Sequence, residues 1–157
     1  MWLRRWLRFG RPGALRVVVD TNVLISGTIV TAGASARIVD AALNRWLRLV
    51  ICPFLLTEYA EVVQRPRIAH KYAKIAQRVD DLLDYFGSYT VVVAGIPQQP
   101  FVPADPDDDA VVAAALEGHA AYIVSGDQHL LELKRVRDVR ILTPRDFVAQ
   151  VLKEPLH

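Results

Sequence analysis

Several residue patterns are scarce or missing in this sequence, and each absence excludes a class of protein. Cys52 is the sole cysteine of the 157 residues, which excludes an intramolecular disulfide and is typical of the reducing cytoplasm. No apolar run approaches the ~20 residues of a transmembrane helix, so we expect no membrane span. The four histidines are scattered and form no Cys/His zinc cluster. No glycine-rich loop has the Lys-Ser/Thr ending that binds phosphate.

The overall composition is that of a globular protein with a large core. Hydrophobic residues make up 52% of the chain and charged residues 23%, which argues against disorder. The mean hydropathy of +0.20 suits a buried parallel sheet covered by helices on both faces. A length of 157 residues indicates one folded domain.

The net charge of +2 conceals an uneven distribution. Residues 1–16 contain five arginines and no acid, whereas the remaining residues contain 14 basic and 17 acidic side chains, a formal charge of −3. We therefore interpret residues 1–15 as a basic N-terminal extension and residues 16–157 as the domain. The domain as a whole does not resemble a polycation that grips phosphates without specificity.

Apolar runs alternate with helical patterns along the domain. The predicted strands are 16–20, 49–52, 90–93, 121–124 and 139–142. The predicted helices are 35–47, 53–64, 71–86, 106–116, 128–133 and 144–152. This alternation predicts a three-layer α/β/α fold around a parallel sheet of about five strands. Ligands of such sheets bind beyond the carboxyl ends of the strands.

Acidic side chains occur at two such strand ends. Asp20 follows the run Val17-Val18-Val19 directly, and Asp127 follows the fourth predicted strand after Ser125-Gly126. Each of these two carboxylates could instead cap the helix or turn that comes next. Capping and cation binding are compatible, because both place a carboxylate in the crevice above the sheet.

A third acidic segment, Asp105 to Asp109, lies between them. Asp105 is a good N-cap, Pro106 suits the first helical position, and the next two acids favour the positive end of the helix dipole. Asp109 lies beside the apolar stripe of this helix and is expected to lean toward the sheet. We therefore select Asp109 as the functional acid, with Asp108 as its supporting neighbour.

Several carboxylates in one crevice repel one another unless a cation neutralises them. Oxygen ligands select Mg²⁺ or Mn²⁺ over zinc, and such ions suit phosphodiester hydrolysis. Glu58 and Glu61 lie on the helix after the second strand. Helical periodicity alone gives no preference for Glu58 over Glu61.

The chain resembles the PIN-domain family, in particular the VapC-like toxins of toxin–antitoxin systems, from about residue 16 to residue 151. The stretches that carry the resemblance are Val18-Val19-Asp20-Thr21-Asn22-Val23-Leu24, Thr57-Glu58, Asp105-Pro106-Asp107-Asp108-Asp109 with Ala113-Ala114-Ala115, Tyr122-Ile123-Val124-Ser125-Gly126-Asp127 with Leu130-Leu131, and Ile141-Leu142-Thr143-Pro144-Arg145-Asp146-Phe147. One departure is visible, because His129 stands where relatives often carry an acid.

The resemblance implies a metal site of four acids, and it favours Glu58 over Glu61. These acids are Asp20, Glu58, Asp109 and Asp127. It further implies Asn22 and Ser125 as groups that orient the ligands, and a sheet order of 3-2-1-4-5. Homodimerisation and inhibition by a cognate antitoxin protein are implied as well.

The resulting hypothesis is a cytoplasmic, Mg²⁺- or Mn²⁺-dependent endoribonuclease that acts as the toxin of such a pair. An activated water attacks phosphorus in line and leaves 5′-phosphate and 3′-hydroxyl ends. Four arginines are candidates to hold the RNA backbone: Arg37, Arg65, Arg67 and Arg145. The alternative hypothesis is a non-catalytic PIN-like module that binds RNA or protein, and it predicts no dependence on metal.

Overall fold

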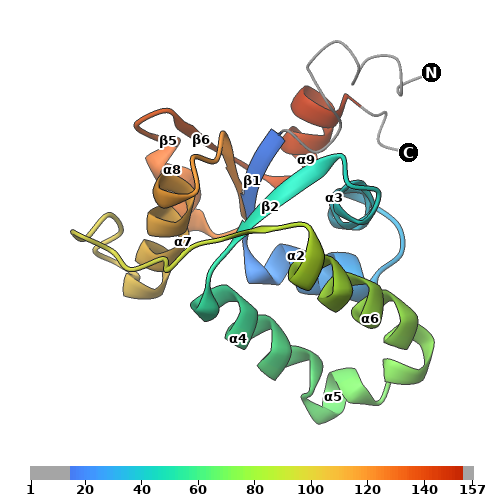
Figure 1. Ribbon diagram of the computed structural model, residues 1–157. Coiled ribbons are helices and arrows are strands. Elements are labelled where there is room, and N and C mark those ends of the chain that lie inside the picture. The colour runs from blue at the N-terminus through green and yellow to red at the C-terminus, as the bar shows by residue number, and fades with distance from the viewer. Residues whose placement is uncertain (1–14, 154–157) are drawn as a thin grey trace.

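A computed structural model describes residues 15–153 and has a central sheet with helices on both faces (Figure 1). The predicted basic extension therefore lies outside the described residues, apart from Leu15. The strands are β1 (Leu15–Val19), β2 (Leu47–Ile51), β3 (Val91–Val92), β4 (Tyr122–Val124), β5 (Arg135–Val136) and β6 (Val139–Leu142). They form a six-stranded sheet in the order β3-β2-β1-β4-β6-β5.

The predicted strand order is confirmed, with one addition. The five predicted strands correspond to β1, β2, β3, β4 and β6, and they pair in parallel in the order 3-2-1-4-5. The sixth strand, β5, pairs antiparallel with β6 at the edge of the sheet. Its two residues are too few to give a periodic signal in the sequence, which is why it was not predicted.

Parallel pairing brings the ends of β1 and β4 to the same level. Val19 stands opposite Val124, and the ladder continues one step further because the amide of Asp20 donates to the carbonyl of Val124 at 2.9 Å. The amide of Ser125 in turn donates to Leu142 on β6 at 3.0 Å. Asp20 and Ser125 are thereby fixed side by side at the carboxyl edge of the sheet.

Most predicted helices are confirmed to within a few residues, and two further helices are present. The helices are α2 (Thr21–Ile29), α3 (Ala34–Leu43), α4 (Pro53–Val63), α5 (Pro66–Ala69), α6 (Tyr72–Ser88), α7 (Pro106–Glu117), α8 (Gln128–Leu133) and α9 (Pro144–Phe147), and α9 continues as the π-helix η1 (Val148–Leu152). The unpredicted helices are α2 and the single turn α5. Since α2 buries residues on several sides, it shows no amphipathic stripe.

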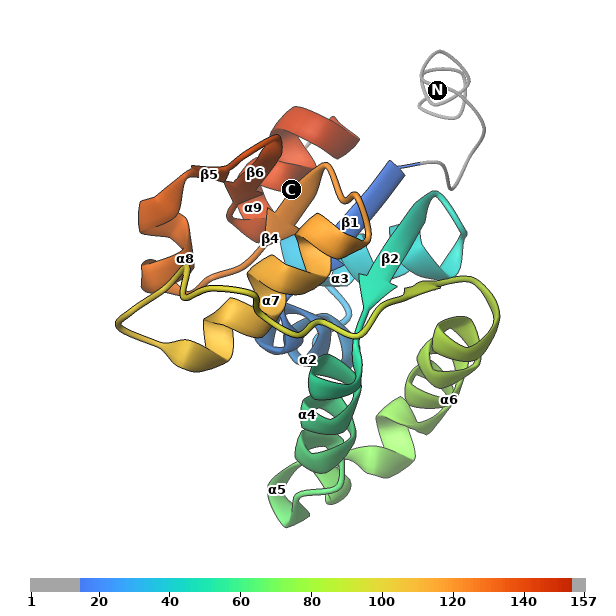
Figure 2. The same cartoon turned by 60° about the vertical axis from the view of Figure 1, so that its left-hand side comes forward.

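The sheet separates two hydrophobic cores, which confirms the three-layer architecture (Figure 2). Alternate residues of a strand face opposite sides, so Val17 and Val19 enter one core and Val18 the other. The first core contains side chains of α2, α3, α6 and α9, and the second contains side chains of α7 and α8. The α7–α8 layer therefore covers the face of β1 and β4 opposite to α2.

Two contacts hold α2 in place beneath the sheet. At Gly27, α2 approaches α3 so closely that an added Cβ would lie 2.4 Å from the carbonyl oxygen of Ser35. Arg78 on α6 donates to the carbonyls of Gly27 and Ala36 and forms an ion pair with Asp40 at 2.8 Å. No single helix in residues 15–153 is long and apolar enough to cross a membrane, and the joint segment α2–α3 meets the length and composition criteria only with a 93° bend.

The close approach at Gly27 predicts a strong effect of a single methyl group. Gly27→Ala should lower the free energy of unfolding by about 1–3 kcal/mol, because α2 and α3 must separate to admit the Cβ. The matched control is Gly87→Ala in α6, where nothing lies within 4 Å and helix propensity should add about 0.5–1 kcal/mol. Urea unfolding of both variants measures the difference, and equal stability of the two would contradict the close packing.

Candidate metal centre

Three carboxylates converge where α7 and α8 begin. Asp105, Asp108 and Asp127 each offer an oxygen, and these oxygens all lie within 4.8 Å of one another. Asp105 is the N-cap of α7, where its Oδ1 accepts from the amide of Asp107 at 3.1 Å. Asp127 is the N-cap of α8, where its Oδ1 accepts from the amide of His129 at 2.8 Å. The predicted capping roles of both residues are thus confirmed, and they place both carboxylates in one crevice.

Asp20 joins this group through Ser125. The Ser125 hydroxyl is fully buried and donates to Oδ2 of Asp20 at 2.7 Å. The same hydroxyl accepts from the amide of Asp127 at 3.0 Å. Ser125 therefore links the acid that follows β1 to the acid that follows β4, as a group that orients both.

The pKa values record the electrostatic cost of this arrangement. Burial, followed by the neighbouring charges of Asp127, Asp105 and Asp20, raises the pKa of Asp108 to about 7. Burial also raises the pKa of Asp20, while hydrogen bonds from Ser125 and the Thr21 amide oppose that rise. In the ion-free protein the crowded carboxylates therefore favour protonation of Asp108 near neutral pH.

The donor set fits a small divalent cation. Oδ2 of Asp108 is buried and has no hydrogen-bond partner among the described residues, and the same holds for the hydroxyl of Thr21, the residue after Asp20. A buried carboxylate oxygen without a partner is costly unless a cation or proton satisfies it. All the available ligands are oxygens, which Mg²⁺ and Mn²⁺ prefer. Asp105, Asp108 and Asp127 could hold such an ion, with Asp20 beside them.

Asp109, the acid selected from the sequence, points elsewhere. It is buried, as expected, but its Oδ1 accepts from the amides of Phe101 and Val102, both at 2.7 Å. The side chain thus reaches back from the first turn of α7 to the loop before it, and the structure does not bring it into the group of three carboxylates. Asp108, expected only as a supporting neighbour, holds the central position instead.

Two other predicted residues stand apart from the three-carboxylate group. Glu58 is half-buried on α4, and Asn22 is exposed on the first turn of α2. Their roles as ligand and orienting group stay predictions. Sequence reasoning did not select Asp105 for the site, although its spacing to Asp108 is a usable signal. Residues i and i+3 at a helix start lie on the same side, so one cation can contact both.

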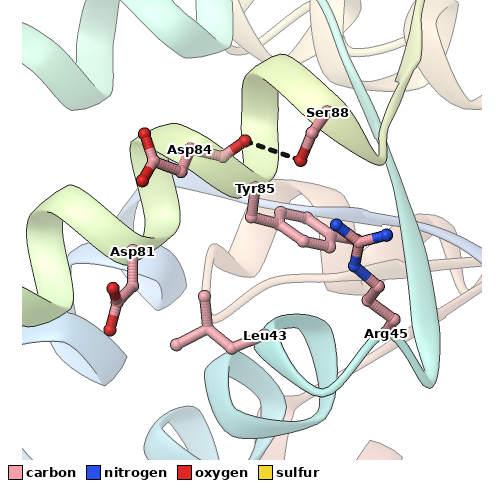
Figure 3. A pocket seen from close by; sticks show the side chains of 6 residues that line it. All are labelled: Leu43, Arg45, Asp81, Asp84, Tyr85 and Ser88. Atoms are coloured by element: carbon pink, nitrogen blue, oxygen red, sulfur yellow. Dashed lines mark hydrogen bonds between the residues drawn. The ribbon is translucent and has the colours of Figure 1, made fainter.

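A separate pocket of about 260 Å³ lies at the opposite edge of the sheet, between α3, α6 and the amino end of β2 (Figure 3). Tyr85 in its wall donates to the carbonyl of Leu47 at 2.7 Å and accepts from the amide of Leu49 at 3.0 Å. Burial raises the pKa of this phenol to about 12, so it stays neutral. The hydroxyl is committed to β2, and we assign the pocket a structural role.

A family model and one relative match this chain. The family model, described as PIN domain, matches residues 16–129, a range that includes β4, all but the first residue of β1, and the acids Asp20, Asp105, Asp108 and Asp127. An uncharacterized protein of Methanocaldococcus jannaschii, MJ1680, is 28% identical over 148 residues, with 88% of this chain and 93% of that protein covered. No solved structure matches the chain.

The raised pKa of Asp108 predicts how the stability of the ion-free protein varies with pH. Its folded pKa of about 7 exceeds the ordinary aspartate pKa of 3.8, so the stability contribution of this group falls as pH rises from about 4 to about 7. Asp108→Asn removes that titration. In EDTA, urea midpoints of the variant should therefore fall less than those of the wild type between about pH 5 and about pH 8.

The matched control is Asp81→Asn, which changes an exposed carboxylate on α6. Its urea midpoints should vary with pH as those of the wild type do. An Asp108→Asn protein with the wild-type pH dependence would contradict the crowding inferred at Asp108.

Proposed function

Because the chain belongs to the PIN-domain family, we propose that it is a metal-dependent endoribonuclease with its active site at Asp20, Asp105, Asp108 and Asp127. PIN domains are generally nucleases and typically use divalent metals. The single observation that supports the proposal most strongly is the convergence of three carboxylates around a buried Asp108 oxygen that has no hydrogen-bond partner within residues 15–153.

In this proposal the clustered acids bind the metal and the scissile phosphate lies beside them. Asp105, Asp108 and Asp127 hold Mg²⁺ or Mn²⁺, and Asp20 faces the same crevice in an orientation that Ser125 fixes. A bound divalent cation would supply Lewis acidity to the scissile phosphate and acidify the attacking water. In-line attack leaves 5′-phosphate and 3′-hydroxyl ends.

Glu58 and Asp109 receive different roles. The half-buried Glu58 on α4, a helix that begins directly after β2, is proposed as a further carboxylate toward the substrate side of the cluster. Asp109 is proposed to hold the loop at residues 101–102 against α7 through its two hydrogen bonds. This loop precedes Asp105, so Asp109 supports the position of that ligand.

The decisive experiment compares two neighbouring aspartates. Asp108→Asn should abolish Mn²⁺- or Mg²⁺-dependent cleavage of a labelled RNA, because it removes charge from the centre of the ligand group. Asp109→Asn should retain cleavage, since the amide oxygen can still accept from the two loop amides. EDTA should inhibit the wild type, and added Mn²⁺ or Mg²⁺ should restore it.

Two outcomes would redirect the assignment. Loss of cleavage in Asp109→Asn together with full activity of Asp108→Asn would restore the original choice of Asp109 as ligand. Metal-independent RNA binding, without cleavage and with tolerance of both substitutions, would instead support the non-catalytic PIN-like module that the sequence left open.

We extend the proposal to a toxin of the VapC-like type that acts in the cytoplasm as a homodimer and is inhibited by a cognate antitoxin. This extension rests on the motifs from Asp20 to Phe147 and on the proposed nuclease site. Expression of the wild type should arrest growth, Asp108→Asn should not, and the product of an adjacent small reading frame should relieve the arrest. Growth arrest by both forms would argue against toxicity through cleavage.

A further inference from the structure

A basic surface lies near the carboxyl-terminal end of α2, whereas the carboxylates lie at its amino-terminal end. Five exposed side chains around α5 and the start of α6 form what we call the distal basic surface: Arg65, Arg67, His70, Lys71 and Lys74. The stretch from residue 65 to residue 78 contains five arginines and lysines and no acid, although residues 17–157 carry a formal charge of −3. This stretch is therefore strongly positive within a domain of negative net charge.

These cations are available to a partner. None of the five is in ion-pair contact with a carboxylate in residues 15–153, in contrast to Arg78 further along α6, which pairs with Asp40. An intramolecular network does not account for the exposed cations. A polyanion would gain Coulomb energy and release counterions on binding them.

A pocket opens within this surface, between the end of α2 and the α5–α6 turn. It has a volume of about 360 Å³ and is lined by Ile29, His70, Lys71, Lys74 and Ile75. Two isoleucines provide apolar wall, an imidazole provides a ring for stacking, and two ammonium groups supply positive charge. This combination fits an unstacked nucleotide, whose base contacts apolar and aromatic groups while its phosphate contacts lysine.

Helix α2 joins this pocket to the carboxylate site. Asp20 is the N-cap of α2, and Ile29 is its last residue and lines the pocket. A helix of nine residues rises about 13 Å at ~1.5 Å per residue, which is the rise of about four stacked nucleotides at ~3.4 Å each. One strand can therefore contact both places.

We propose that the distal basic surface binds the phosphate backbone of single-stranded RNA about four nucleotides from the cleavage point, with one base in the Ile29–Lys74 pocket. The proposal rests on the proposed nuclease function and adds a second substrate contact to it. Arg65 and Arg67, two of the arginines expected from the sequence to hold the RNA backbone, belong to this distal basic surface. An acidic protein segment is the competing occupant. It has no base to stack on the imidazole ring, and it gives no reason for the pocket to lie at a fixed distance from Asp20.

The test measures RNA binding without cleavage. The probe is a fluorescein-labelled oligouridine of about 16 nucleotides, titrated in EDTA with full-length Asp20→Asn protein between about 50 and 200 mM salt. Adding Lys71→Gln and Lys74→Gln should weaken binding and reduce the slope of log K against log salt by about 1.4, or ~0.7 per lost phosphate contact. His70→Ala should weaken binding, because it removes the ring on which the base is proposed to stack.

The matched control removes two exposed arginines from the β5–β6 edge, Arg135→Gln and Arg140→Gln. It should leave the slope unchanged. Equal slopes in the lysine and arginine variants would overturn the proposal, and so would binding of polyglutamate, in place of RNA, that depends on Lys71 and Lys74.

This outcome is independent of the nuclease test. If the wild type fails to cleave RNA but the lysine variant shows the reduced slope, the nuclease proposal fails and the distal surface stands. If the wild type cleaves RNA but the lysine substitutions leave the slope unchanged, the distal-surface proposal fails and the nuclease proposal stands.

Discussion

Parallel pairing of β1 with β4 is the constraint on which the candidate site depends. The register that sets Val19 opposite Val124 brings two distant parts of the chain to one level, and it leaves Asp20 within hydrogen-bond distance of the Ser125 hydroxyl. Ser125 then fixes the amide of Asp127. A shift of one residue between the strands would turn Ser125 to the other face and remove this link.

The carboxylates are held at an electrostatic cost that the fold only partly offsets. Asp20, Asp105 and Asp127 each occupy an N-cap position, where the partial positive charge of a helix start favours a carboxylate. Asp108 lies in the first turn of α7, yet burial and its acidic neighbours still raise its pKa to about 7. The hydrophobic layers on both sides of the sheet must therefore stabilise a centre in which Asp108 disfavours its charged state.

The sequence predicted the parts of this molecule that follow from local patterns. Apolar runs identified the five parallel strands, and the strand-then-acid pattern placed Asp20 and Asp127 at the correct edge. Helical periodicity could not distinguish Asp108 from Asp109, because the two side chains are almost equally buried, with exposed fractions of 7% and 8%. What separates them is a tertiary contact, the loop amides of Phe101 and Val102 that capture Asp109.

Contacts between distant segments explain the remaining differences. Helix α2 was not predicted because its burial on several sides erases the amphipathic stripe. Because α2 was missing from the prediction, the distance that it spans was unknown. Arg65 and Arg67 therefore could not be placed relative to Asp20. The partnership of Asp105 with Asp108 likewise requires the position of Asp127, which comes from β4 and not from the helix that carries them.

Arg78 gives the arrangement a fixed dimension. Its guanidinium donates to Gly27 of α2 and to Ala36 and Asp40 of α3, so it ties α6 to the helix whose N-cap is Asp20. The distance between the carboxylates and the cations at the start of α6 is therefore set by the packing of α2 against α3 and α6. An RNA strand that contacts both places would therefore meet the protein at two points whose separation is a property of the fold.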